Sequence, residues 1–124
     1  MKETVLLFNA PEKERLLKIE MALFPHHIRL KRVPTEDYNQ PLGVLAGIRD
    51  IPPAEGKYEG GELPDTLFVF CNFSDSRLEQ VLASLRKCGA GPFPYKAVLT
   101  PTNSRWTAPD CFTEIRREHE AMHP

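Results

Sequence analysis

The sequence predicts an α/β fold: a small three-layer sandwich in which a four-stranded, mainly parallel sheet carries helices on both faces. Two observations support it. The runs TVLLF at Thr4–Phe8 and TLFVFC at residues 66–71 are apolar throughout, which is typical of strands covered on both faces. Each run is followed by apolar residues at helical spacing and then by a second, mixed strand, so that a β-α-β-α unit is written twice.

Length and composition indicate one domain over residues 1–124. The chain is 41% hydrophobic, enough for a single core, and its 16 basic and 17 acidic residues leave a net charge of -1. No global field attracts nucleic acid or an anionic membrane, and we expect neither as a partner. The apolar run near the start is too short for a signal peptide or a membrane span, which favours a cytoplasmic location. The three cysteines form no Cys-x-x-Cys pair and lie in apolar patterns, so we expect buried, reduced thiols at Cys71, Cys88 and Cys111.

The first half contains two helical patterns around an alternating strand. Residues 11–24 predict a helix with a wide apolar stripe, and Pro25 ends it; the stripe comprises Leu16, Ile19 and Leu23, with Leu17 and Phe24 beside them. Residues 26–33 (HHIRLKRV) alternate, as in a strand with one wet face or an edge strand protected by charge. The basic residues there are also compatible with phosphate binding. Residues 41–49 predict a short helix.

A loop rich in proline and glycine, residues 50–64, is expected to be mobile and to join pseudo-repeats 1–49 and 65–124. An offset of 62 residues superposes the first strand and helix of the two halves, and an offset of 67 superposes the remainder. The second half then reads as a strand at 66–71, a helix entered through Ser74 and ended near Gly89, a strand near Tyr95, and a helix from Thr107 to about Met122.

Burial predicts the strand order. Because the first strand of each half is apolar on both faces, it should be central, giving the order 2-1-3-4 with a pseudo-twofold axis along the strands. In a parallel sheet all carboxyl ends meet at one edge, so one crevice would collect Asn9, Thr35, Asn72 and Asn103. The alternative is a ferredoxin-like α+β fold of order 4-1-3-2, whose antiparallel central pair would divide these residues between opposite edges.

The stretch Pro94 to Trp106 (PYKAVLTPTNSRW) delivers a polar turn to the end of a strand. Together with Glu118-His119-Glu120 it resembles a small bacterial domain family of unknown function, in which a KAVLTPTN-like strand and turn precede a tryptophan and a C-terminal Glu-His. The resemblance covers residues 64–122. It implies no activity, substrate or cofactor, but it marks candidate ligand-binding positions: Lys96, Thr100, Thr102, Asn103, Trp106 and His119.

Recognisable catalytic chemistry is sparse. The glycines do not form a phosphate-binding loop between a strand and a helix. Cys71 is the one candidate nucleophile at a strand end, and burial explains it better. His119 and His123 share a helix face at a spacing that suits two zinc ligands, but two ligands alone do not hold a metal. We therefore expect no metal and no cofactor, while the question of catalysis stays open.

Two functions remain. The sequence favours a non-enzymatic regulatory or protein-interaction module with an unknown protein or small-molecule partner. The alternative is a small-molecule sensor or small enzyme that uses a crevice near Thr102, Asn103 and Trp106, with Asn9 and Asn72 as further candidates. A purely structural explanation of the turn is also open, in which Asn103 satisfies turn backbone and Trp106 covers the start of the last helix.

Overall fold

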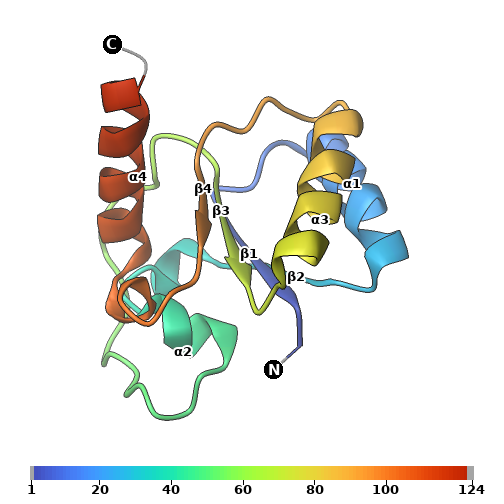
Figure 1. The fold of residues 1–124 in the computed structure, drawn as a ribbon. Coiled ribbons are helices and arrows are strands. Elements are labelled where there is room, and N and C mark those ends of the chain that lie inside the picture. The colour runs from blue at the N-terminus through green and yellow to red at the C-terminus, as the bar shows by residue number, and fades with distance from the viewer. Residues whose placement is uncertain (1, 123–124) are drawn as a thin grey trace.

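A computed structural model describes residues 2–122 and contains eight helices and strands in the predicted alternation (Figure 1). The strands are β1 (Thr4–Phe8), β2 (Arg29–Arg32), β3 (Leu67–Cys71) and β4 (Lys96–Val98). The helices are α1 (Lys13–Leu23), α2 (Leu42–Ala46), α3 (Asp75–Lys87) and α4 (Ala108–Met122). Single turns of 3₁₀-helix occupy Phe24–His26, Thr35–Asp37 and Asn103–Arg105.

The sheet has the predicted order, β2-β1-β3-β4, and β1 and β3 are buried along their whole length. Two of its three strand pairs are parallel, β1 with β2 and β3 with β4. The central pair is antiparallel, with Thr4 opposite Cys71 and Phe8 opposite Leu67. The order 4-1-3-2 of the ferredoxin-like alternative is not observed, but its antiparallel central pair is. The expectation that all carboxyl ends meet at one edge is therefore wrong.

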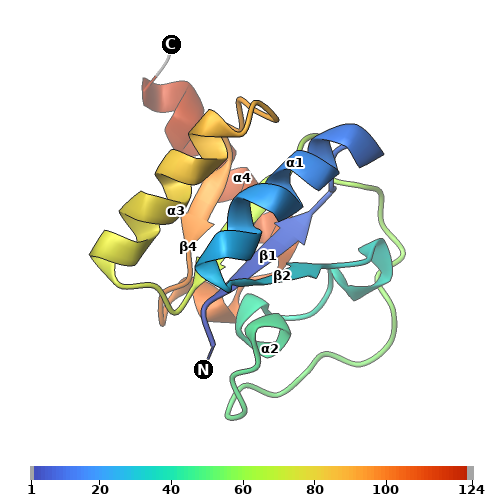
Figure 2. The same ribbon diagram turned by 90° about the vertical axis from the view of Figure 1, so that its right-hand side faces the viewer.

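The predicted helices on both faces are confirmed. Helices α1 and α3 lie side by side on one face, and α2 and α4 cover the other (Figures 1 and 2). A pseudo-twofold axis along the strands would have placed α1 and α3 on opposite faces, so that prediction is wrong. The observed arrangement corresponds to an axis perpendicular to the sheet, between β1 and β3, because such an axis keeps equivalent helices on the same face.

The structural offset between the central strands differs by one residue from the offset read in the sequence. Strand β1 begins at Thr4 and β3 at Leu67, an offset of 63. Leu6 and Val69, which this offset relates, both pack on the α2–α4 side, whereas the sequence offset of 62 relates Leu6 to Phe68 on the other side. A shift of one residue moves every side chain to the opposite face of a sheet. A duplication of the sequence itself stays a prediction.

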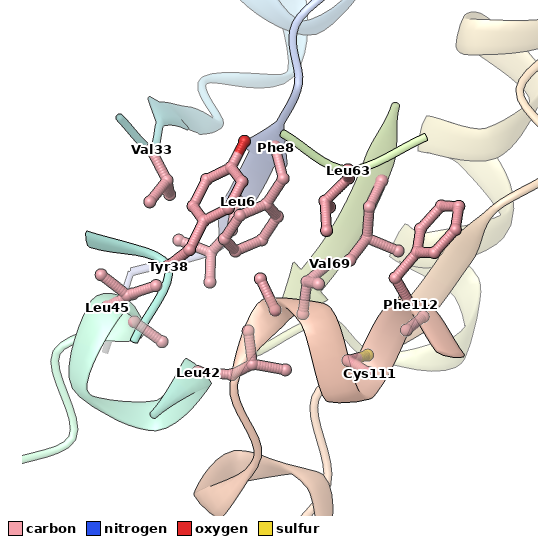
Figure 3. Packing of buried hydrophobic residues seen from close by; sticks show 14 of the residues in the cluster. Leu6, Phe8, Val33, Tyr38, Leu42, Leu45, Leu63, Val69, Cys111 and Phe112 are labelled. Atoms are coloured by element: carbon pink, nitrogen blue, oxygen red, sulfur yellow. The ribbon is translucent and has the colours of Figure 1, made fainter. Parts of the chain in front are cut away.

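Each face of the sheet has its own apolar core. The α2–α4 core is seen in Figure 3, where Tyr38 lies among Val33, Leu6 and Phe8 with its hydroxyl at the margin of the cluster. The rings of Phe8 and Tyr38 meet edge to face, with centroids 5.6 Å apart. The α1–α3 core contains the buried aromatic, aliphatic and branched side chains Phe68, Phe70, Ile19, Val81 and Leu85.

The segment 50–64 makes more contacts than its composition indicates. Ile51 and Leu63 are buried, and the side-chain amide of Gln40 makes two hydrogen bonds of 2.9 Å with the backbone of Ala54. Its mobility remains a prediction. Two elements are shorter than predicted. Strand β2 starts only at Arg29, after His27 at φ 57°. Helix α2 ends at Ala46 and is capped by Gly47, whose φ of 95° suits glycine.

Candidate functional site

The turn between β4 and α4 is held together by Asn103. The Asn103 side-chain carbonyl accepts a 2.8 Å hydrogen bond from the Thr100 backbone N–H, while the Asn103 N–H donates to the Thr100 hydroxyl at 3.1 Å. The Asn103 side-chain amide also donates to the Val98 carbonyl at 2.9 Å. Both polar atoms of the side chain are thus bonded within the turn, and the structural explanation of Asn103 is the one that the geometry favours.

The same turn supports helix α2. The Trp106 carbonyl accepts a 2.8 Å hydrogen bond from the Leu42 N–H at the first residue of α2. Ser104 is buried and its hydroxyl donates to the Pro101 carbonyl at 2.8 Å. Trp106 itself is half-buried against the α2–α4 core. The backbone of the turn therefore satisfies a helix N-terminus that has no side-chain cap.

The four polar residues expected in one crevice lie at two opposite edges of the sheet. Asn72 and Asn103 follow β3 and β4, whereas Asn9 and Thr35 follow β1 and β2, and the antiparallel central pair separates the two groups. A cavity of about 410 Å³ at the first edge is lined by Asn72, Thr100, Ile51 and Arg105, among others. Thr102, Asn103 and Trp106 are not among its lining residues.

The opposite edge carries a polar network that joins the predicted Asn9 and Thr35 to two residues that the sequence did not single out, Tyr38 and Glu62. The buried Tyr38 hydroxyl donates to Glu62 Oε1 at 2.5 Å and accepts from the Asn9 backbone N–H at 2.9 Å. The Thr35 hydroxyl reaches Glu62 Oε2 at 3.4 Å, and the Asn9 side chain donates to the Leu63 carbonyl at 2.8 Å. The pKa of Tyr38 is raised, mainly by burial and to a lesser extent by the hydrogen bond with Glu62. The sequence signal for Tyr38 was an isolated tyrosine inside a polar connection.

Lys96 lies apart from the other candidates, on the α3 side of β4. Its ammonium group donates to the Phe93 carbonyl and borders a cavity of about 420 Å³. The residue reaches solvent, but its ammonium group is partly desolvated. This desolvation lowers the pKa of Lys96, and repulsion from the Arg86 guanidinium lowers it further.

His119 packs against Tyr95, with ring centroids 5.5 Å apart. Its potential co-ligand His123 lies outside the described residues. Within residues 2–122, no three His, Cys, Asp or Glu side chains are grouped as a metal site requires.

Cys71 and Cys111 are poor nucleophiles. Cys71 and Cys111 are buried and all three thiols are free, as the sequence predicts, although Cys88 is only partly buried. Burial raises the pKa of the Cys71 thiol to about 12. Burial, with a smaller contribution from Glu118, raises the pKa of Cys111 to about 11. The thiolate is the reactive form, so neither residue is activated at neutral pH.

An apolar surface on α1 was also missed. Three apolar side chains point into solvent: Leu17 is 55% exposed, Met21 66% and Phe24 79%. Leu17 and Phe24 were predicted beside the core stripe, whereas Met21 was not singled out. The spacing of the three, by four and three residues, places them on one helix face. The signal was available, because the apolar stripe of this helix is wider than the core-facing side needs.

Met21 also belongs to a groove between α1 and α3, with a volume of about 450 Å³. The charged residues that line this groove are basic, Lys18 and Lys87, while His26 is bonded to the Ser84 hydroxyl at 2.8 Å. We call the three exposed residues and this groove the α1 surface. It combines apolar side chains with positive charge.

Comparison with known proteins yields one match. The second half of the chain, residues 66–122, is similar to a family described as Domain of unknown function (DUF3783). No curated protein and no solved structure matches the chain. Among the described residues, no helix is both long and apolar enough to cross a membrane.

Proposed function

We propose that the protein is a non-enzymatic interaction module that docks an acidic, amphipathic helical segment of a partner protein on its α1 surface. The observation that carries this proposal is the exposed row Leu17, Met21 and Phe24, which follows α1 and its C-cap on the side away from the buried Leu16, Ile19 and Leu23. Contiguous apolar side chains in solvent mark interaction sites more often than isolated ones do.

The chemistry of the groove supports an acidic partner segment. Lys18 and Lys87 line it and no carboxylate does, so an acidic segment is electrostatically complementary. An amphipathic helix presents apolar anchors at spacings of three and four residues, which match the row on α1. The three free cysteines suit a reducing compartment, and we place the module in the cytoplasm of a bacterium, in keeping with the resemblance of its second half.

The other candidate, a ligand crevice near Thr102, Asn103 and Trp106, has less support. Asn103 is engaged by its own turn, and the cavity beside that turn is lined by other residues. The buried thiols of Cys71 and Cys111 and the hydrogen-bonded side chain of Asn103 are not poised for catalysis.

Photo-crosslinking tests the proposal. A photoreactive amino acid is placed at Phe24 and, as the control, at Lys57, whose side chain is exposed in segment 50–64. Crosslinks formed in the producing cells are mapped by mass spectrometry. We expect position 24 alone to join a segment of another protein that has a net negative charge and apolar residues at helical spacing.

Charge reversal makes the test specific. Lys18→Glu with Lys87→Glu should abolish the crosslink, whereas Lys13→Glu, a matched change on α1 outside the groove, should leave it intact. Identical products at positions 24 and 57, a segment without acidic residues, or a second copy of this chain at position 24 would each overturn the proposal.

A further inference from the structure

The cavity beside Lys96 lies at the open edge of the sheet. Phe68 on β3 and Lys96 on β4 are cross-strand partners, so their side chains project from the same face, the one covered by α3. Leu82, Leu85 and Arg86 of α3 form the opposite wall, and residues 91–94 close the end of the cavity. Three segments of the chain thus line a cavity of about 420 Å³ that is partly open to solvent.

The floor of the cavity is apolar and closely packed. Phe68 is fully buried, and its ring centroid lies 4.8 Å from that of Phe93. The far side of Phe93 is fixed by Arg15, whose guanidinium lies 5.2 Å from the ring centroid and whose Nε donates to the Ala90 carbonyl at 2.7 Å. The aromatic wall is therefore supported from behind, which favours a cavity that keeps its shape without a ligand.

Two cationic side chains, Lys96 and Arg86, line this apolar cavity without a neighbouring carboxylate. Within residues 2–122, neither of the two cations is part of a salt bridge, and the Lys96 ammonium has only the Phe93 carbonyl as its hydrogen-bond acceptor. The guanidinium of Arg86 lies close enough to lower the pKa of Lys96. Like charges at a partly desolvated site repel each other, and a bound anion would relieve that repulsion.

We propose that this cavity binds a small amphipathic monocarboxylate, with the acid group between Lys96 and Arg86 and the apolar body on Phe68, Leu82 and Phe93. Arginine and lysine are the usual partners of a carboxylate, and an apolar cavity with a few convergent polar groups is the usual form of a ligand site. The volume lies at the lower end of the roughly 300–1,000 Å³ typical of such sites. Since a water molecule takes up about 30 Å³, the cavity suits on the order of ten non-hydrogen atoms.

Three probe molecules separate the contribution of the carboxylate to binding from that of the apolar tail. Octanoate carries both the charge and the tail, 1-octanol carries only the tail, and acetate only the charge. Each is titrated into ¹⁵N-labelled protein. We expect saturable shifts of the backbone amides of Phe68, Phe93 and Lys96 with octanoate, and at least about tenfold weaker binding of 1-octanol and acetate, because each lacks one class of contact.

Variants assign the charge to its residues. Lys96→Gln and Arg86→Gln should each weaken octanoate binding several-fold and leave the affinity for 1-octanol unchanged. Lys57→Gln, at an exposed lysine in segment 50–64 that lines neither this cavity nor the α1 groove, should alter neither affinity. The amide spectrum of each variant reports whether it remains folded. Absence of saturable shifts with octanoate, equal affinity for octanoate and 1-octanol, or full affinity in the Lys96→Gln/Arg86→Gln double variant would overturn the proposal. The site is separate from the α1 surface, so its failure does not bear on that proposal.

Discussion

The asparagines that drew attention in the sequence have backbone roles. Asn9 and Asn72 each follow a buried strand at positive φ, 52° and 68°, a conformation that asparagine adopts more readily than most residues. Asn103 organises its turn through three hydrogen bonds. Residue type therefore identified the ends of the strands correctly, but a polar side chain at a strand end does not by itself distinguish a ligand contact from a turn.

Replacing Asn103 tests this role. Asn103→Ala removes the acceptor of the Thr100 N–H and the donor to the Val98 carbonyl, and we expect the free energy of unfolding to fall by about 1–2 kcal/mol. Thr102→Ala, a change at an exposed residue of the same turn, should lower the free energy of unfolding by less than about 0.5 kcal/mol. Urea denaturation measures both. A neutral or stabilising Asn103→Ala would return this residue to the list of ligand candidates.

The buried thiol of Cys71 makes stability depend on alkaline pH. Its pKa is raised from an ordinary value of 9.0 to about 12, so between these values the folded chain keeps a proton that the unfolded chain has lost. The stability contribution is present below pH 9 and is lost as pH rises toward 12. Denaturation at pH 8 and pH 10 should show a smaller pH-dependent loss for Cys71→Ala than for the wild type. Equal losses would contradict the assignment.

At the scale of elements, the spacing of apolar residues predicted where helices and strands occur. It did not predict how long each element is or which of its apolar residues are buried. Helix α1 has the predicted apolar stripe, yet only part of that stripe faces the core. Helix α3 packs against one side of α1, and the other side is left in solvent. Helix α2 is a five-residue element whose first N–H is satisfied by the Trp106 carbonyl. That support comes from a turn more than sixty residues away, and no local pattern encodes it.

Gly43 tests how closely α2 fits against that turn. A Cβ at this position would lie 2.5 Å from Cδ1 of Ile51 and 3.0 Å from the Ser104 carbonyl oxygen. Gly43→Ala should therefore destabilise the protein by about 1–3 kcal/mol through overpacking, despite the better helix propensity of alanine. Gly61→Ala, where a Cβ meets nothing within 4 Å, is the control and should be close to neutral. Thermal unfolding that ranks the two variants in the reverse order would show that α2 is not tightly docked.

At the scale of the whole molecule, strand order followed from burial but strand direction did not. TVLLF and TLFVFC predicted the two central strands, and both are central. A fully buried strand is apolar on both faces whether its neighbour runs parallel or antiparallel, so the pattern carries no information on direction. The connection from β2 to β3 is long enough for either. In the antiparallel arrangement, the Thr66 hydroxyl donates a 2.7 Å hydrogen bond to the Asn9 carbonyl. This contact joins residues 57 positions apart, so no local pattern predicts it.

The connection itself offers a test of the predicted mobile loop. Glu62→Ala removes the acceptor of the buried Tyr38 hydroxyl, and we expect a loss of about 1–3 kcal/mol in the free energy of unfolding. Glu59→Ala, an exposed neighbour in the same segment, should have almost no effect. If segment 50–64 is as mobile as its composition suggests, the two variants will be indistinguishable in chemical denaturation.

The antiparallel pairing of β1 with β3 also bears on how the matched half, residues 66–122, behaves when it is alone. Separated from the first half, β3 would expose an unpaired edge along five residues that are now buried. Because β1 and β3 have equal length and present corresponding faces, a second β3 fits the place of β1, and light scattering should find residues 65–122 as a symmetric dimer. In the full chain that interface is intramolecular, so its strength is set by the effective concentration that the connection provides and does not fall on dilution.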